Sequence, residues 1–114
     1  MKTTDECVFV TNEHELDEIL RVKDRAVVLI YATWCPFCVS FLPVFKKYAQ
    51  STADFVLAQD NEERVADRYG VDVVPTVIFF VNGQVSKRLD GALGKGLNEK
   101  QLQDFINKCN LPDA

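Results

Sequence analysis

Two patterns of apolar and polar residues recur along the chain, one typical of buried strands and the other of amphipathic helices. Residues 26–31 form a continuous apolar run rich in β-branched side chains, which predicts a strand covered on both faces. Further along, Cys38, Phe41, Leu42 and Phe45 follow the three-, four- and seven-residue spacing of one apolar helix face. The chain is therefore expected to combine buried strands with helices that pack on them.

The expected strands and helices alternate along most of the chain. In order, they are a strand at 7–11, a helix at 12–22, a strand at 26–31, a helix that starts beside Cys35 and ends near Gln50, a strand at 55–59, a helix at 62–69, strands at 76–81 and 84–89, and a last helix with Leu102, Phe105, Ile106 and Cys109 on its apolar face. Gly70 is expected to end the third helix, Asn82-Gly83 to form a hairpin turn, and Pro43 to kink the second helix. The tail at 110–114 is expected to fray.

This order predicts an α/β fold in which a central mixed sheet is flanked by helices on both faces. Parallel strands would be joined by right-handed crossovers, the strand at 26–31 would lie in the centre, and the hairpin would form an antiparallel edge. A chain of 114 residues has the length of one domain, so a single domain is expected to span residues 1–114.

Composition and charge narrow the class of partner. With 47% hydrophobic and 26% charged residues, the chain has a globular composition and not a disordered one. A net charge of -4 offers no basic surface to nucleic acid, and no apolar stretch approaches the roughly 20 residues that span a bilayer. The first residues lack the apolar run of a secretory signal. A cytoplasmic monomer is expected, with no nucleic-acid or membrane partner.

Two of the four cysteines stand in the motif Cys35-Pro36-Phe37-Cys38, at the expected start of the second helix. Cysteines at this spacing can form a reversible disulfide. The free N–H groups and the dipole of a helix start favour an anion, so Cys35 is the predicted attacking thiolate. Cys38, on the apolar side of the first turn, is predicted to resolve the mixed disulfide that Cys35 forms, and this exchange needs no bound cofactor.

The alternative interpretations of the motif are half of a zinc site and two core cysteines. A closed zinc site needs two further ligands, and the candidates Cys7, His14 and Cys109 lack paired spacing, so no metal is expected. Cys109 is expected to be a buried, unreactive thiol and His14 to face solvent. A regulatory disulfide of Cys7 is not favoured in a reducing cytosol.

Five motifs occur in order along the chain: Ala32-Thr33-Trp34-Cys35-Pro36-Phe37-Cys38, Pro43, Tyr69-Gly70-Val71, Val74-Pro75-Thr76 and Gly91-Ala92-Leu93. Their joint occurrence resembles the thioredoxin family over essentially the whole chain and implies the thioredoxin fold. The resemblance implies that Pro75 is a cis proline beside the disulfide and that the backbone of Val74 bonds an extended substrate segment. Without it, a trans proline at the strand entry would be the better interpretation, because about one X–Pro bond in twenty is cis.

The resemblance also implies a flat apolar docking surface for substrates beside Cys35. Its expected members are Trp34, Pro36, Phe37, Val74, Pro75, Gly91 and Ala92. Exposed apolar patches of this kind usually mark partner surfaces. The alternative is that Trp34 and Phe37 are half-buried packing residues, but docking is favoured because both border the reactive thiol.

The chain departs from the family pattern at positions that bear on the second thiol. Typical thioredoxins have a buried Asp six residues before the first Cys and a Lys on the following strand, and the matching positions here are Leu29 and Val56. A carboxylate can take the proton of Cys38, whereas apolar residues cannot, so either water accepts it or resolution is slow. Pro36-Phe37 is closer to the Cys-Pro-Tyr-Cys motif of glutaredoxins, and this dipeptide affects the redox potential.

Two polar residues near the motif suggest a further hydrogen bond beside the second helix. Tyr31 stands where thioredoxins commonly have Trp and Asp60 matches a family Asp, so a hydrogen bond between the two side chains is hypothesised. The equal alternative is a Tyr31 hydroxyl in solvent. The charged residues among 60–64 are expected to form a solvated helix start.

Together these expectations predict that the protein is a thiol-disulfide oxidoreductase. It would act as a reductant of disulfide-containing protein substrates and be recycled by an external reductase or thiol reductant. One alternative is glutaredoxin-like recycling by glutathione, although no basic cluster stands beside the motif. The other is a binding module whose two cysteines act only as a redox sensor, which the apolar Leu29 and Val56 favour.

Overall fold

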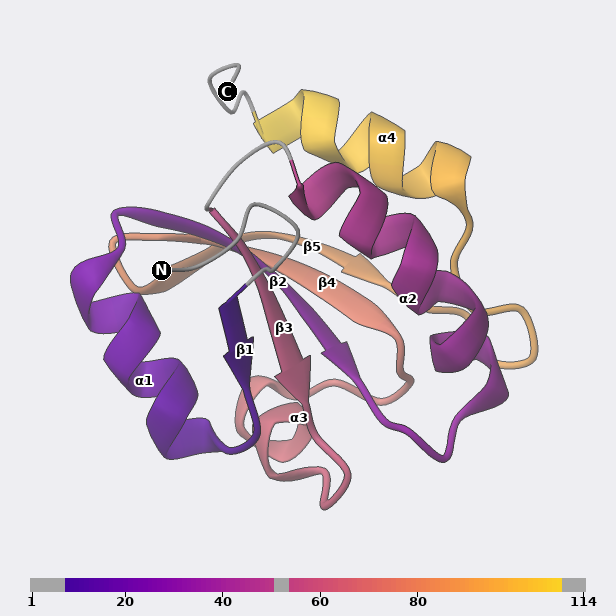
Figure 1. Ribbon diagram of the computed structural model, residues 1–114, viewed down its shortest axis with the longest axis horizontal. Helices are drawn as coiled ribbons and strands as arrows, with labels where there is room; N and C mark the ends of the chain where they lie inside the picture. The colour runs from indigo at the N-terminus through magenta and orange to yellow at the C-terminus, as the bar shows by residue number, and fades with distance from the viewer. Residues whose placement is uncertain (1–7, 51–53, 110–114) are drawn as a thin grey trace.

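The computed structural model describes residues 8–50 and 54–109, which fold into a five-stranded mixed sheet between two pairs of helices (Figure 1). The elements are β1 (Val8–Val10), α1 (Glu13–Val22), β2 (Arg25–Tyr31), α2 (Pro36–Ala49), β3 (Phe55–Gln59), α3 (Arg64–Tyr69), β4 (Thr76–Val81), β5 (Gln84–Asp90) and α4 (Glu99–Cys109). Every expected element is present. The ends at Cys7 and at 110–114 lie outside the described residues, so the predictions made for them stay predictions.

The sheet order is β1-β3-β2-β4-β5, so β2 lies in the centre as predicted. β1, β3 and β2 run parallel, whereas β4 pairs antiparallel with both β2 and β5. Residues 26–31 of β2 are all buried. The continuous apolar run of this strand follows from its position, because a central strand is covered on both faces.

The helices divide between the two faces of the sheet, and successive β2 residues alternate between them. Leu29 packs with buried residues of α2 and α4, whereas Ile30 packs with buried residues of α1 and α3. Figure 1 shows α2 and α4 together on one side of the sheet and α1 on the other. This alternation matters for the site, because a shift of one residue along a strand moves a side chain to the opposite face.

The turns follow the predicted backbone chemistry with one difference. Asn82 and Gly83 both have positive φ, 52° and 80°, which suits the tight turn between β4 and β5. Gly70 ends α3 with φ 64°, as predicted. However, Glu63 also has a left-handed φ of 64°, so α3 starts at Arg64 and not at residue 62.

Helix α2 runs from Pro36 to Ala49 and continues through Pro43. Pro36 stands at the first helical position, where its missing N–H has no partner to lose. Pro43 does not end the helix, and the kink expected there stays a prediction. The helix therefore carries the motif on its first turn and packs on the sheet along its whole length.

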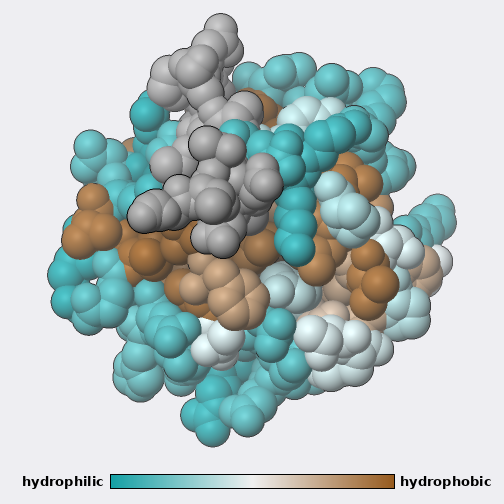
Figure 2. Space-filling view, viewed as in Figure 1, coloured by the Kyte–Doolittle hydropathy of each residue, from teal (hydrophilic) through white to brown (hydrophobic). Residues whose placement is uncertain are grey.

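Apolar side chains also reach the surface. In the view of Figure 2 they form a band across the middle of the molecule between polar rims. The exposed large apolar residues are Phe9, Val22, Trp34, Phe37, Val39, Val85 and Leu93. Within residues 8–50 and 54–109, no helix is both long enough and apolar enough to cross a bilayer.

Candidate active site

Cys35 stands at the junction between β2 and α2, as the residue that precedes the first helical turn. Its backbone N–H donates to the Ala32 carbonyl at 3.3 Å, and its own carbonyl accepts from Val39 at 3.0 Å. The turn that follows β2 thus places Cys35 at the start of α2. Cys35 keeps 7% of its surface exposed, whereas Cys38, one turn deeper, keeps none. The predicted difference in access between the two thiols is confirmed.

The two sulfurs make different hydrogen bonds. The Cys35 thiol donates to the Val74 carbonyl, with Sγ and O 3.6 Å apart, and Cys38 Sγ accepts from the Ala32 N–H at 3.4 Å. Within the described residues Cys35 makes no capping bond to the amides of α2, so the expected amide hydrogen bonds are absent. Pro36 has no N–H to offer, and the thiol turns instead toward the segment before β4.

Burial raises the pKa of the Cys38 thiol to about 12, because a thiolate loses more solvation than a thiol in an apolar interior. The hydrogen bond from Ala32 opposes this effect but does not cancel it, and the adjacent Cys35 raises the pKa further. Leu29 lies in the same apolar cluster as both cysteines. Cys38 therefore resembles a nucleophile that is kept protonated until it reacts.

The register between β2 and β3 corrects one expectation about the apolar residues near Cys38. Val56 was expected to be one of two apolar replacements beneath the second thiol. It lies on the opposite face, in the cluster covered by α1 and α3. The β3 residue in register with Leu29 is Leu57, which shares its face with Cys38. The cluster that contains Cys38 is apolar as expected, but it includes Leu57 and not Val56.

The Val74–Pro75 peptide bond is cis, which confirms the expectation for Pro75. Two contacts hold the segment around it. The Thr76 hydroxyl donates to the Val73 carbonyl at 2.6 Å and accepts the Gly91 N–H at 3.3 Å. A Cβ on Gly91 would lie 2.3 Å from the Pro75 carbonyl oxygen, so only glycine fits there. Gly91 positions this segment by close backbone approach.

A cavity of about 240 Å³ opens beside Cys35. Five of the predicted site residues line it: Trp34, Cys35, Phe37, Val74 and Ala92. Of the other four, Pro36 is exposed at the start of α2, Cys38 and Pro75 are buried, and Gly91 lies against the Pro75 carbonyl oxygen. The structure thus brings the first turn of α2, the segment before β4 and the loop after β5 around one thiol.

The aromatic residues of the cavity are exposed but held in place. Trp34 is 56% exposed and Phe37 42%, so both face outward. The Trp34 indole N–H donates to the Asn61 carbonyl at 3.1 Å, and Phe37 packs so closely on Gly96 that a Cβ there would lie 2.9 Å from the Phe37 Cβ. A fixed, exposed aromatic pair at a thiol is what docking requires, because little side-chain freedom remains to be lost.

Eight residues that line this cavity were not among the predicted site residues: Asp60, Glu63, Ala66, Val71, Asp72, Val73, Leu93 and Gly94. Leu93 is 88% exposed, and the exposed acids Glu63 and Asp72 also line the cavity. Leu93 belongs to the Gly91-Ala92-Leu93 motif, so its place could have been inferred. The two acids lie far from Cys35 in sequence, and no local pattern connects them with it.

The hypothesised hydrogen bond between Tyr31 and Asp60 is not formed. The Tyr31 hydroxyl donates to Gln59 Oε1 at 3.4 Å, because these residues are in register on β2 and β3. Asp60 is buried, and its two carboxylate oxygens accept the N–H groups of Val65 and Ala66 at 2.9 and 2.8 Å. Asp60 therefore caps α3 from beneath and is not part of a solvated helix start.

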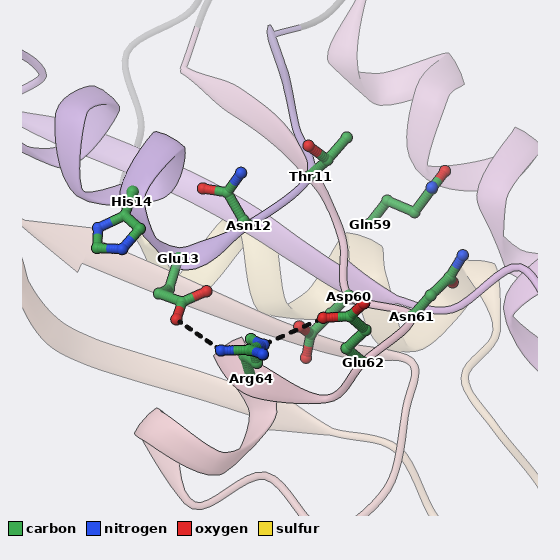
Figure 3. A pocket seen from close by; sticks show the side chains of 9 residues that line it. All are labelled: Thr11, Asn12, Glu13, His14, Gln59, Asp60, Asn61, Glu62 and Arg64. Carbon is green, nitrogen blue, oxygen red and sulfur yellow. Dashed lines mark hydrogen bonds and ion pairs between the residues drawn. The ribbon is translucent and has the colours of Figure 1, made fainter.

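A second, polar cavity of about 430 Å³ lies next to the first, where β1 and β3 end and α1 begins. His14 is exposed at its edge, as expected. Figure 3 shows Arg64 between Glu13 and Glu62, and the ion pairs measure 3.9 and 3.1 Å. Asn12 caps α1 through the Glu15 N–H at 2.9 Å. Three of the residues that line this cavity, Glu13, Glu62 and Arg64, are therefore joined by ion pairs.

Cys109, the third described cysteine, does not line the cavity at Cys35. Cys109 is buried on α4 as predicted, and burial raises its pKa to about 11. Cys7 lies outside the described residues. Among the residues that the structure describes, no group of three or more His, Cys, Asp or Glu side chains could hold a metal ion.

Comparison with known proteins extends these observations. The family model described as thioredoxin matches residues 7–108. A thioredoxin of Mycoplasmoides gallisepticum is 33% identical over 89 residues, covering 75% of this chain and 89% of the relative. A thioredoxin of Mycobacterium tuberculosis is 31% identical over 105 residues, covering 89% and 90%. The solved structure of a mutant thioredoxin from Halobacterium salinarum NRC-1 matches with a TM-score of 0.75 at 27% identity, covering 100% of this chain and 99% of that one.

Proposed function

The chain belongs to the thioredoxin family of thiol-disulfide oxidoreductases, and from that premise we propose that it reduces protein disulfides, with Cys35 as nucleophile and Cys38 as resolving thiol. The observation that carries this assignment of roles is the difference between the two sulfurs. Cys35 lines an open cavity, whereas Cys38 is fully buried one turn beneath it. A substrate sulfur has access to the first and not to the second.

In the first step the Cys35 thiolate attacks one sulfur of the substrate disulfide. The bond between Cys35 and that sulfur forms, the substrate S–S bond breaks, and the departing sulfur leaves as a thiolate that takes a proton from water. The Val74 carbonyl, 3.6 Å from Cys35 Sγ, marks where an extended substrate backbone would pair. Trp34, Phe37 and Ala92 would contact its side chains.

In the second step Cys38 loses its proton and attacks Cys35 Sγ. The Cys35–Cys38 disulfide forms and the second substrate sulfur leaves, so the substrate gains two electrons and the thiol pair loses two. The proton passes to water or to the leaving thiolate, since Leu29 offers no acceptor. With a Cys38 pKa near 12, we propose that this step limits turnover.

Recycling requires two electrons from an external reductase or thiol reductant, and no cofactor bound to this chain. The sequence-based expectations of a monomer and of a cytoplasmic location belong to the same proposal. Size-exclusion chromatography with light scattering and fractionation of the source cell test them.

Insulin reduction with dithiothreitol as the electron donor tests the roles of the thiols. Cys35→Ser should lower turnover by a factor of about 1,000 or more, because it removes the attacking atom. Cys38→Ser should retain the first attack and accumulate the mixed disulfide, which intact-mass spectrometry detects. Equal turnover of Cys35→Ser and the unmodified chain would contradict the assignment.

Two outcomes would favour the alternative functions. A negligible rate in the unmodified chain with both thiols reduced would favour a binding module that senses redox state. Efficient turnover with glutathione as the sole donor would favour a glutaredoxin-like reaction. Thiol titration before each assay shows that the starting material is reduced.

A further inference from the structure

The charged side chains that line the cavity at Cys35 are all acidic. Asp60, Glu63 and Asp72 line it, and none of its described lining residues is Lys, Arg or His. The Asp60 carboxylate is buried and held by two backbone N–H groups. Glu63 and Asp72 are exposed, and within the described residues neither side chain makes a hydrogen bond or an ion pair.

Two of the nearby cations, Arg64 and Arg88, are held by other groups, and Lys95, which follows the lining residue Gly94 in sequence, is exposed and does not line the cavity. Arg64 follows Glu63 in sequence, but its guanidinium lies in the neighbouring polar cavity between Glu13 and Glu62 (Figure 3). Arg88 hydrogen-bonds to Asp90 and to the Tyr69 carbonyl at 2.6 Å, and it acts on Asp72 only through longer-range attraction. The charged side chains that line the cavity itself are therefore all acidic.

The apolar surface and the negative charge of the cavity together indicate which kind of substrate fits it. Trp34, Phe37 and Leu93 offer exposed apolar surface on the same cavity as Glu63 and Asp72. An extended substrate segment that carries Lys or Arg near its reacting cysteine could contact the apolar surface and pair with the acids. Oxidised glutathione, which carries net negative charge from its carboxylates, would be repelled.

We propose that Glu63 and Asp72 make this site selective for disulfides flanked by lysine or arginine in protein segments. This inference rests on the proposed function, since it concerns which disulfides Cys35 attacks. The two acids would act on the approach and orientation of the substrate and not on the exchange of sulfurs. Their effect should therefore appear in kcat/KM and should weaken as salt rises.

Two cyclic disulfide peptides, identical except for Lys-Lys or Glu-Glu flanks, provide the test. Each rate is divided by the rate with dithiothreitol, which is uncharged and corrects for the reactivity of the disulfide itself. At low salt the unmodified protein should prefer the lysine peptide by roughly tenfold, and 0.5 M NaCl should reduce this preference to about twofold. The double variant Glu63→Gln with Asp72→Asn should show about twofold preference even at low salt.

Glu62→Gln is the matched control, because it removes the same charge from the adjacent position, which lines the polar cavity only. It should retain the tenfold preference. Equal rates for both peptides at low salt, or an unchanged preference in the double variant, would overturn the selectivity while leaving the reductase function intact. Reduction of neither peptide by protein with titrated free thiols would overturn the function and the selectivity together.

Discussion

Two cavities flank the loop that joins β3 to α3, and they share Asp60 as a wall. The polar cavity beside His14 is the larger, at about 430 Å³ against about 240 Å³ beside Cys35. In the polar cavity Arg64 forms ion pairs with both Glu13 and Glu62 (Figure 3). In the smaller one, exposed apolar side chains lie beside a thiol together with two acids that make no hydrogen bond to another described residue.

This difference shows that size does not identify the site. Polar groups that bind one another gain little from a ligand, since each contact would replace an existing one. Exposed aromatic surface beside a nucleophile gains on contact, because water leaves it. The two cavities lie on either side of one loop. The following substitutions should show which of them contributes to stability and to disulfide reduction.

The largest effect is expected from Gly91→Ala, which acts on the backbone that shapes the thiol cavity. The new Cβ would lie 2.3 Å from the Pro75 carbonyl oxygen, and a backbone atom cannot move aside cheaply. We expect a loss of about 3 kcal/mol in the free energy of unfolding, measured with urea, and slower disulfide reduction. Gly94→Ala is the control, because Gly94 has φ 77° but open space around it, and should lose only about 1 kcal/mol. Equal losses would show that close approach is not the cause.

Asp60→Ala should have the next largest effect, because it removes the wall that both cavities share. The N–H groups of Val65 and Ala66 would lose their acceptor in a buried position. We expect a loss of about 2 kcal/mol in the free energy of unfolding. Glu62→Ala, an exposed acid on the same loop, should change it by less than about 0.5 kcal/mol. Similar losses in the free energy of unfolding for the two variants would show that Asp60 is a solvated residue that does not cap α3.

The rate of the second step should depend steeply on pH. The thiolate is the attacking form, and pH 7 to 9 lies below the Cys38 pKa of about 12, so each pH unit should raise the rate about tenfold. An aromatic disulfide such as 5,5′-dithiobis(2-nitrobenzoate) reports this in stopped flow. Attack by Cys35 releases the first coloured thiolate, and attack by Cys38 on the mixed disulfide releases the second. Cys38→Ser should lack the second phase, and a pH-independent second phase would contradict a protonated Cys38.

The smallest effect is expected in the polar cavity. Arg64→Met removes both ion pairs in Figure 3, but the arginine side chain is 64% exposed, and such pairs contribute little. We expect a change below about 0.5 kcal/mol in unfolding and no change in insulin reduction. A clear fall in turnover would mean that the polar cavity contributes to function, and the contrast between the two cavities would fail.

Much of the fold could be predicted from the sequence because its signals are local. The unbroken apolar run at 26–31 predicted the central strand, and Asn82-Gly83 predicted the hairpin. The Cys35–Cys38 motif at a helix start indicated the chemistry without any structure. Each of these depends on neighbours within a few residues, where periodicity and backbone preference act directly.

The predictions that were wrong depend on which face of the sheet a residue occupies. Val56 was expected beneath the second thiol and Asp60 was expected to bond Tyr31, but strand register turns Val56 toward α1 and α3, and the Asp60 carboxylate accepts two backbone N–H groups of α3. A one-residue difference in register reverses a side chain, and register is set by pairing with a distant strand. The family match alone could not supply that pairing.

The amino-acid sequence by itself determined the order of the elements, the reactive pair of cysteines and the replacement of a buried acid by Leu29. Only the tertiary structure decided that Glu63 and Asp72 line the same cavity as Cys35, that Leu57 shares an apolar cluster with Cys38, and that Gly91 touches Pro75. The reason is that local preferences act along the chain, whereas a site is assembled across it. The packing of separate strands and loops selects which distant side chains share a cavity and how much water each retains.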